Sequence, residues 1–507
     1  MNLKAILLLS ILSFCKNFGF TQPTPLEKHE FKTLSSYSEL SEFIRILDEN
    51  SEIMKVGVIG TSVENRNIYS MTFSKKGIGK NKSKIKVLFF AQQHGNEQSG
   101  KEGTLFLAKT LLKPEYSYLF DKIDLVLIPQ INPDGSELNK RRNANNMDLN
   151  RNHLIMTEPE TNALHTFFDK FHFEVTMDVH EYSPYGDDWK RYGYRKNSDV
   201  TLGSCTNINV SEKLRQFSDS LVLPFFHSEL NEKGFSSFVY CPGGPPDSAY
   251  IRHSTFDIND GRQSLGIQNT LSFIQEGMNG TDTYAENIEH RAKAQMTGML
   301  AMLKLIYSNK TVIKKMVKNE RKSMLSGLKD GKTSIQMTHS GNGKKLELPL
   351  RSYLTGNDTT VLIDDYRPVV KPIKFVNNPV AYLISRSDTN LIKWCKKIDI
   401  KFDNFTLKNK FEIEEYFIVS IDSIDFEGDL VRDPSVNLNK NINIKTSDYY
   451  FIPVAQTKGL IIIQALEPKS MLGLATYPKF EYLIKAKEKY PVLRVINKKN
   501  NSKKIKV

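Results

Sequence analysis

Apolar side chains near the N-terminus recur with the spacing of a helix. In residues 36–47 they occupy the i, i+3, i+4 and i+7 positions of one helical face: Leu40, Phe43, Ile44 and Leu47. Ser36 and Glu39 have the spacing of a capping box, which predicts that the helix begins there. Residues 55–60 and 67–73 follow as two short strands joined by a polar turn, and we expect them to pair antiparallel at the edge of a sheet.

Continuous apolar runs indicate a second type of strand. They occupy residues 87–91, 125–128, 171–179 and 267–274. Runs of this length predict strands buried on both faces, as in a mostly parallel sheet covered by helices. A helical pattern at residues 104–112 fits this arrangement. The predicted fold class is therefore α/β, with a mixed, mostly parallel sheet flanked by helices.

The pattern changes after residue 308. A lysine-rich stretch at residues 311–335 predicts a helix or a linker, and short β-branched and aromatic runs follow it. Four of these runs have strand length: 380–385, 411–421, 449–454 and 459–464. The sequence thus predicts a larger domain at residues 22–310 and a smaller β-rich domain with a basic tail at residues 336–507.

Residues 1–21 have the composition of a signal peptide. One early lysine precedes the apolar segment 5–14, and the small residues Gly19 and Thr21 stand at the −3 and −1 positions of a cleavage site. The apolar segment is too short to cross a bilayer, and no later run reaches about 18 apolar residues. We therefore expect export to the periplasm or the medium, without a membrane span.

Composition adds two limits. The chain has 507 residues, of which 39% are hydrophobic, so it can bury a large core. Its net charge of +13 is typical of some nucleic-acid-binding proteins, but nine basic residues and one glutamate lie between Lys485 and the C-terminus. More than half of the excess is thus one basic tail without an aromatic platform, and we expect no nucleic-acid partner.

The four cysteines do not indicate a disulfide framework or a cysteine zinc site. Cys15 lies in the predicted signal peptide, where the bulky Phe14 before it disfavours a lipoprotein anchor. The remaining three, Cys205, Cys241 and Cys395, are odd in number and have no CxxC spacing. A single bridge among them stays open.

The first candidate site follows a predicted buried strand. His94 and Glu97 are separated by two residues, and Gly95 between them lets the backbone bend, so both side chains can bind one cation. Zinc suits this ligand pair. His180 follows the run at 171–179 and offers a third ligand, because open α/β sheets bind ligands at the carboxyl ends of their strands. A surface histidine beside a glutamate in a loop is the alternative interpretation.

Two further segments carry groups suited to a substrate. Residues 141–152 are dense in guanidinium and amide groups, which either bind an anionic ligand or form a solvated basic loop. Glu276 follows the run at 267–274, where partial desolvation favours either a general base with a raised pKa or pairing with an arginine.

Together these residues resemble the zinc carboxypeptidases of the carboxypeptidase A type. The resemblance rests on elements that occur in the family's order: His94-x-x-Glu97, Asn132-Pro133-Asp134-Gly135, Arg141-x-Asn143-Ala144, Asp148-Leu149-Asn150-Arg151-Asn152, His180 and Glu276. It covers about residues 37–305. Segments near residues 380, 467 and 491 are similar to the C-terminal extensions of exported bacterial members.

The resemblance implies that His94, Glu97 and His180 bind one zinc ion per chain and leave an open position for water. This is the ligand set of carboxypeptidase A itself. Asp148 matches the aspartate that holds the first zinc histidine in the required tautomer.

The resemblance also assigns substrate roles. Arg141 matches the arginine that polarises the scissile carbonyl, and Glu276 matches the general base that takes a proton from the zinc-activated water. Asn150 and Arg151 match the pair that binds the terminal carboxylate of a peptide. The family's mobile tyrosine corresponds to Tyr250.

Two departures accompany these assignments. Asn146-Met147 stands where the family often has Gly-Val, and asparagine tolerates the positive φ of that turn. Tyr240 is the other tyrosine at a suitable distance before Glu276. The residue that selects the substrate side chain is not assigned within 257–265.

The expected function is that of an exported zinc metallocarboxypeptidase that hydrolyses the C-terminal amide bond of peptides. A zinc amidase of the same fold that acts on cell-wall peptide or other amides is one alternative. An inactive peptide-binding homologue is another, but the presence of all three ligands and Glu276 argues against it.

Overall fold

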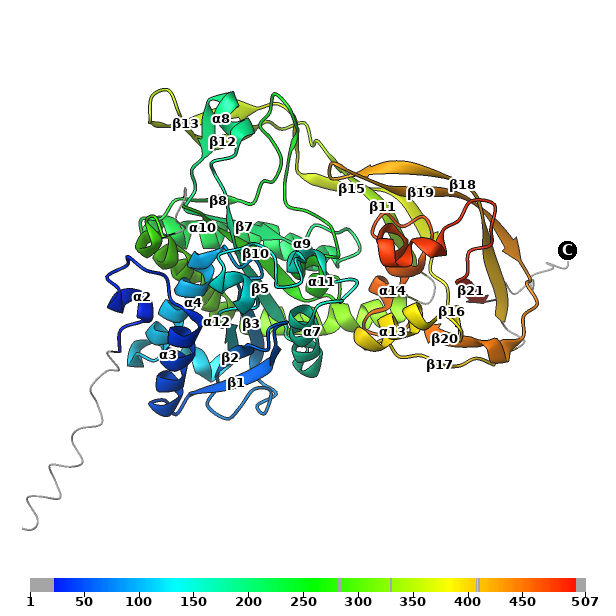
Figure 1. Cartoon of the computed structure of the whole chain (residues 1–507), viewed down its shortest axis with the longest axis horizontal. Helices are drawn as coiled ribbons and strands as arrows, with labels where there is room; N and C mark the ends of the chain where they lie inside the picture. The colour runs from blue at the N-terminus through cyan, green and yellow to red at the C-terminus, as the bar shows by residue number, and fades with distance from the viewer. Residues whose placement is uncertain (1–21, 281–284, 329–330, 407, 409–410, 498–507) are drawn as a thin grey trace, which may run out of the picture.

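The computed structural model of the protein describes residues 22–280, 285–328, 331–406, 408 and 411–497 (Figure 1). The predicted signal peptide, including Cys15, and residues 498–507 of the basic tail lie outside these ranges. Within the described ranges, no helix is long and apolar enough to cross a membrane.

An eight-stranded sheet forms the centre of the N-terminal part, in the order β1-β2-β4-β3-β5-β10-β7-β8. Its strands are β1 (Met54–Thr61), β2 (Asn67–Phe73), β3 (Ile85–Ala91), β4 (Ile123–Ile128), β5 (Val175–Tyr182), β7 (Val200–Ser204), β8 (Ser237–Val239) and β10 (Leu271–Met278). The four central strands β4, β3, β5 and β10 are parallel to one another, whereas β1, β2 and β7 are joined to the sheet by antiparallel pairing. The predicted mixed, mostly parallel sheet is therefore confirmed.

Helices cover both faces of this sheet (Figure 1). The helices of this part and those that border it are α2 (Pro25–Lys28), α3 (Tyr37–Glu49), α4 (Gln98–Leu111), α5 (Leu119–Lys122), α6 (Pro133–Glu137), α7 (Pro159–Phe171), α8 (Asp187–Tyr192), α9 (Glu212–Phe217), α10 (Leu223–Glu232), α11 (Gly261–Gly266) and α12 (Ile288–Gly327). Alternate residues of β3 feed two cores: Phe89 packs in the cluster that contains α4 and α12, and Phe90 packs with α7 and α11. Successive residues of β3 point to opposite faces, and both faces are covered by helices. Residues 87–91 are therefore apolar throughout.

The first predicted elements are confirmed. Ser36 caps α3, and its side chain and that of Glu39 form the expected capping box. β1 and β2 pair antiparallel at the edge of the sheet. Asn146 has a φ of 57°, so asparagine does supply the positive φ of its turn.

Two predicted strands begin later in the chain than expected. The segment 171–179 begins at the last residue of α7, and β5 starts only at Val175. The segment 267–274 begins after α11, and β10 runs from Leu271 to Met278. A short apolar run does not distinguish a helix end from a buried strand, which explains both errors. As a consequence, Glu276 lies within a strand rather than after it.

The long helix α12 packs on the N-terminal part and continues without a break past residue 310, leading into the C-terminal part. A six-stranded sheet follows in the order β17-β20-β16-β21-β18-β19. Its strands are β16 (Ala381–Ser385), β17 (Asp403–Asn404), β18 (Phe411–Phe426), β19 (Asp429–Lys440), β20 (Tyr449–Pro453) and β21 (Leu493–Asn497). The predicted strand at 459–464 is wrong, because this segment forms the buried helix α14 (Gly459–Leu466). The other helix of this part is α13 (Thr389–Lys397).

The remaining strands form small sheets that reach back to the N-terminal part (Figure 1). They are β6 (Tyr194–Lys196), β9 (Ile251–Arg252), β11 (Lys332–Ser340), β12 (Leu346–Ser352), β13 (Asp358–Ile363), β14 (Tyr366–Arg367) and β15 (Val369–Asn377). β12 pairs with β6, β14 pairs with β9, and β11 pairs with β15. Two loops of the N-terminal part are thus held by strands that follow them by more than a hundred residues.

Candidate metal centre

The predicted metal ligands lie together where β3 and β5 end. β3 ends at Ala91, His94 follows in the next turn, and Glu97 is the residue before α4. His180 lies inside β5, which is parallel to β3. Parallel strands bring their carboxyl ends to one edge of the sheet, so ligands from separate strands converge there.

The donor atoms of this triad face one another. His94 Nδ1 lies 2.7 Å from Glu97 Oε1, His180 Nδ1 lies 2.8 Å from Glu97 Oε2, and the two Nδ1 atoms are 3.2 Å apart. One ligand atom from each residue lies within 4.8 Å of the others. All three side chains are buried. Two imidazole nitrogens and a carboxylate in this arrangement form the donor set of an open catalytic zinc site.

The charges within the triad support a cation at its centre. Burial alone would raise the pKa of Glu97, but the charges of His94 and His180 lower it below its usual range. Burial alone would lower the pKa of His180, but the carboxylates of Asp178 and Glu97 raise it well above its usual value. Without metal, the triad therefore retains a proton that a divalent cation would displace.

Each histidine has a carboxylate on its far side. His94 Nε2 lies 3.1 Å from Asp148 Oδ1, and His180 Nε2 lies 2.9 Å from Asp178 Oδ1. The hydrogen bond from His94 Nε2 to Asp148 fixes the tautomer of His94 that leaves Nδ1 free for a metal, and Asp178 places a negative charge beside His180. Asp148 was predicted and Asp178 was missed. Its place in the sequence could have identified Asp178: it lies two residues before His180 in the same strand, and residues i and i+2 of a strand share a face.

Gly95 is required for a close approach rather than for an unusual backbone conformation. A Cβ atom there would lie 2.1 Å from the carbonyl carbon of Gly135 and 2.5 Å from the carbonyl oxygen of Lys140. Its φ is not positive. The predicted tight bend is present, because the Glu97 N–H donates to the His94 carbonyl at 3.1 Å, and Gly95 also permits a close contact between this turn and the loop that carries the Asn-Pro-Asp-Gly motif.

Glu276 lies next to the triad. β10 pairs with β5 so that Glu276 is directly opposite His180, and residues in register point to the same face of a sheet. The side chain is buried. Burial raises the pKa of Glu276 to about 7, the charge of Glu97 adds to this, and that of His180 opposes it. A carboxyl group with this pKa can both take and release a proton near neutral pH.

Arg141 lies at the rim of the same centre. Its Nε donates to Asp148 Oδ2 at 3.1 Å, and its Nη1 lies 3.5 Å from Glu97 Oε1. The side chain is 46% exposed. One edge of the guanidinium is thus bound to the protein while the group remains accessible to a ligand.

Asn150 and Arg151 follow Asp148 in a short 3-10 turn. Asn150 is buried, and its Oδ1 accepts a hydrogen bond from the backbone N–H of Gly261 at 2.8 Å. Arg151 is exposed. The charges of Asp257 and Asp148 raise the pKa of Arg151, although burial opposes them. The basic segment is thus anchored by its amide, with a guanidinium at the surface.

The two candidate tyrosines differ in their surroundings. The ring of Tyr250 packs under the Arg367 guanidinium, 4.1 Å from it, and β14 holds the adjoining β9. Burial raises the pKa of Tyr240, and the charge of Glu276 adds to this effect. The structure thus places Tyr240 within electrostatic range of Glu276, whereas the assignment of Tyr250 stays a prediction.

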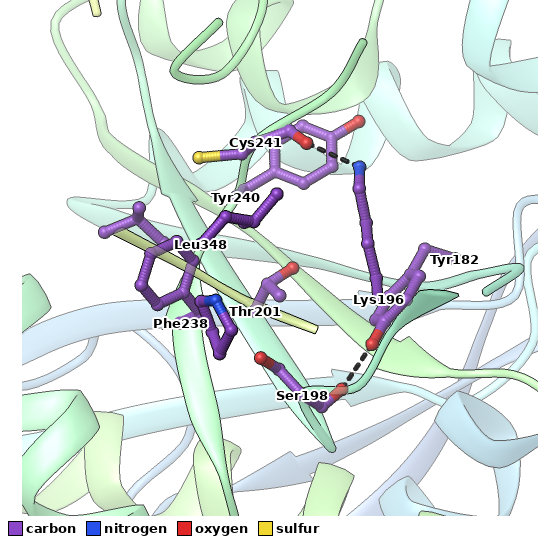
Figure 2. A pocket seen from close by; sticks show the side chains of 10 residues that line it. Tyr182, Lys196, Ser198, Thr201, Phe238, Tyr240, Cys241 and Leu348 are labelled. Atoms are coloured by element: carbon purple, nitrogen blue, oxygen red, sulfur yellow. Dashed lines mark hydrogen bonds between the residues drawn. The ribbon is translucent and has the colours of Figure 1, made fainter. Parts of the chain in front are cut away.

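Tyr240 also lines a small pocket on this side of the sheet (Figure 2). Thr201 on its wall is directly opposite Glu276 in the sheet, and Leu348 is contributed by β12 of the C-terminal part. The Lys196 amine donates to the Cys241 carbonyl at 2.6 Å beside it. A cavity of about 40 Å³ holds a few water molecules rather than a substrate side chain.

Glu181, the residue after His180, points away from the centre. It forms an ion pair with Arg291 of α12, and the two side chains are 0% and 4% exposed. Successive strand residues point to opposite faces, so Glu181 and His180 are separated by the sheet. Cys205, Cys241 and Cys395, for which a disulfide bridge was left open, are all free and buried.

The chain is similar in sequence to known carboxypeptidases. A family model described as zinc carboxypeptidase matches residues 40–219. Carboxypeptidase 2 of Trichophyton equinum is 22% identical over 448 residues, which cover 84% of this chain and 79% of that protein. Carboxypeptidase D of Homo sapiens is 26% identical over 268 residues, 47% of this chain and 19% of that protein. Among solved structures, carboxypeptidase A of Helicoverpa armigera has a TM-score of 0.43 and 18% identity, and the match covers 55% of this chain and 75% of that one.

Proposed function

We propose that the chain is a zinc carboxypeptidase, since the model of that family matches residues 40–219, that it removes C-terminal residues from peptides, and that Glu276 is its general base. The observation that carries the proposal is the register of β5 and β10, which sets the buried Glu276 beside the metal ligand His180. A carboxyl group with a pKa of about 7 at this position is suited to accept a proton from an attacking water.

His94, Glu97 and His180 would hold the metal through Nδ1, a carboxylate oxygen and Nδ1. A bound zinc ion supplies Lewis-acid polarisation of a carbonyl and lowers the pKa of a water toward ~7. Asp148 orients the His94 imidazole by accepting from its Nε2–H group, and Asp178 lies as a counter-charge beside Nε2 of His180.

Glu276 and Arg141 act on the scissile bond. Glu276 takes the proton of the attacking water and passes it to the leaving amine. Arg141 is held by Asp148 at one edge and presents the rest of its guanidinium to the carbonyl oxygen, where negative charge develops in the transition state.

Asn150 and Arg151 bind the terminal carboxylate of the substrate. Gly261 donates to the Asn150 side chain, so the atom it meets is the oxygen and the amide NH₂ remains for a ligand. The Arg151 guanidinium supplies a planar pair of donors that matches a carboxylate bidentately. Recognition of this group restricts cleavage to the last peptide bond.

The proposal extends to location. Export rests on the signal peptide predicted at residues 1–21. Mass spectrometry of the culture fractions would find the mature N-terminus at residue 22 outside the cytoplasm.

A peptide library and a set of cell-wall muropeptides test the reaction directly. The zinc-loaded protein is incubated with both, and the products are identified by mass spectrometry. Loss of single C-terminal residues from peptides supports the proposal. Cleavage of muropeptides alone, or of peptides with amidated C-termini at equal rates, would instead identify an amidase.

A further inference from the structure

A chain of close contacts between buried polar side chains leads from the metal centre into the protein. His180 Nε2 lies 2.9 Å from Asp178 Oδ1, and the other oxygen of Asp178 accepts from Gln93 Nε2 at 2.8 Å. Gln93 Oε1 meets His153 Nε2 at 2.6 Å, and His153 Nδ1 meets His165 Nε2 at 2.9 Å. Each of these side chains is at most 2% exposed.

The chemistry of these groups leaves one arrangement of protons. A carboxylate only accepts, so Gln93 must turn its NH₂ toward Asp178 and its oxygen toward His153. His153 therefore carries its proton on Nε2, and its Nδ1 accepts from His165. Burial lowers the pKa of His153 to about 4, which keeps the ring neutral as this pattern requires.

Gln93 also touches the substrate side of the site. Its Nε2 lies 3.4 Å from Asn150 Oδ1, which accepts in turn from Gly261. Space for this junction depends on Gly261, because a Cβ atom there would lie 2.4 Å from Asp178 Oδ2 and 2.6 Å from Gln93 Nε2. The Gln93 amide thus contacts both Asp178, which lies behind His180, and Asn150, which is proposed to bind the substrate carboxylate.

We infer that Gln93 is a positioning residue: its amide, oriented by His153, fixes Asp178 behind the metal ligand His180 and holds Asn150 in place for the substrate carboxylate. The inference rests on the proposed metal site. Gln93 does not touch the metal or the reacting atoms, and it acts through Asp178 and Asn150.

The expected size of the effect follows from this geometry. Removal of a group that orients a metal-bound histidine typically weakens metal binding by about 10–100-fold. Gln93→Glu keeps the shape of the side chain but places an acceptor against Asp178 Oδ2, so Asp178 and His180 must move apart from their present contact. We expect a zinc Kd raised by about 10–100-fold and a raised KM for peptides with a free carboxylate, because Asn150 loses its neighbour.

Gln336→Glu is the matched control. Gln336 is also buried, and its Nε2 donates to Asp433 Oδ1 at 2.8 Å in the C-terminal part. Gln336→Glu also replaces an NH₂ donor with an acceptor oxygen beside an aspartate, but it does so away from the metal centre. We therefore expect the zinc Kd of this variant to equal that of the wild type. A general effect of burying a carboxylate would appear in both variants.

His153 provides a second pair of variants. His153→Gln retains an N–H group for Gln93, whereas His153→Leu does not. We expect zinc affinity to fall in His153→Leu and to recover at least in part in His153→Gln. Circular dichroism of the metal-free proteins establishes that each variant is folded before its Kd is measured.

Chelator competition measures the zinc Kd, and the visible spectrum of the cobalt-substituted protein reports the geometry of the ligands. A wild-type zinc Kd and an unchanged cobalt spectrum in folded Gln93→Glu would overturn the inference, even if activity fell. Failure of the wild-type protein to bind zinc or to cleave peptides would instead overturn the proposed function.

Discussion

Replacement of Glu276 by glutamine separates the chemistry of this residue from its effect on stability. Glu276→Gln keeps the size of the side chain and one acceptor oxygen, but its amide cannot accept a proton. We expect kcat to fall by at least about 10²-fold, the low end of general-base contributions, while zinc occupancy remains. We also expect the metal-free protein to become more stable.

The gain in stability follows from the pKa. Burial raises the pKa of Glu276 from 4.5 to about 7, so ionising it costs about 3 kcal/mol more in the folded than in the unfolded metal-free chain. Wild-type stability is therefore fully present below pH 4.5 and falls as the pH rises through about 7. Glutamine has no such penalty, so the variant should gain up to about 3 kcal/mol at pH 8 and little at pH 4.5.

Urea unfolding in the presence of a chelator, at pH 4.5 and pH 8, measures the stability difference, and steady-state hydrolysis measures kcat. If kcat stayed within a few-fold of wild type, Glu276 would not be the base. If the stability difference were the same at both pH values, the carboxyl group would not have the raised pKa on which the reasoning depends.

Glu181→Gln is the internal control, because Glu181 is an equally buried glutamate one strand residue away from His180. It breaks the buried ion pair with Arg291 and should cost about 3–5 kcal/mol of stability. The folded, zinc-loaded variant should keep kcat within several-fold. A large loss of kcat with intact zinc binding would show that Glu181 takes part in the chemistry.

Three further substitutions test the remaining assignments. His180→Ala should weaken zinc binding strongly in metal analysis, and one tightly bound zinc per chain with unchanged affinity would remove His180 from the ligand set. Arg151→Ala should raise KM for peptides with a free terminal carboxylate far more than for amidated ones, and equal effects would contradict carboxylate recognition. Arg367→Ala frees the ring of Tyr250 and should change KM more than zinc affinity, and unchanged kinetics would place Tyr250 outside the substrate site.

Much of the fold could be predicted because its signals are local. The apolar spacing of α3 and its capping box depend only on nearby residues, and both are confirmed. The run that forms α14 was misread as a strand because all its residues are buried, and a helix buried on every side has no polar face to reveal its period. The lysine-rich stretch at residues 311–335 predicted a helix or a linker, and the helix is what forms there as far as Gly327, as a continuation of α12.

The candidate site was predictable to the extent that each ligand follows a recognisable strand. His94, Glu97 and His180 were found in this way, and the structure brings them together. The residues behind them were harder to find, because their partners are distant in the chain: Gln93 meets Asp178 across 85 residues and His153 across 60. Such contacts follow from the register of β3 and β5, which the sequence does not specify.

The C-terminal part has a structural relation to the site that composition could not indicate. β12 pairs with β6, and β14 pairs with β9, so strands of this part complete two loops that flank the metal centre. Strand pairing satisfies backbone groups that would otherwise need water, and it costs the entropy of closing a long segment. The loop that carries Tyr250 is therefore held by hydrogen bonds within its own sequence and also by residues 365–367, whose carbonyls accept from the N–H groups of Ile251 and His253. A region that the sequence predicts as a separate domain therefore shares strand pairing with the N-terminal part.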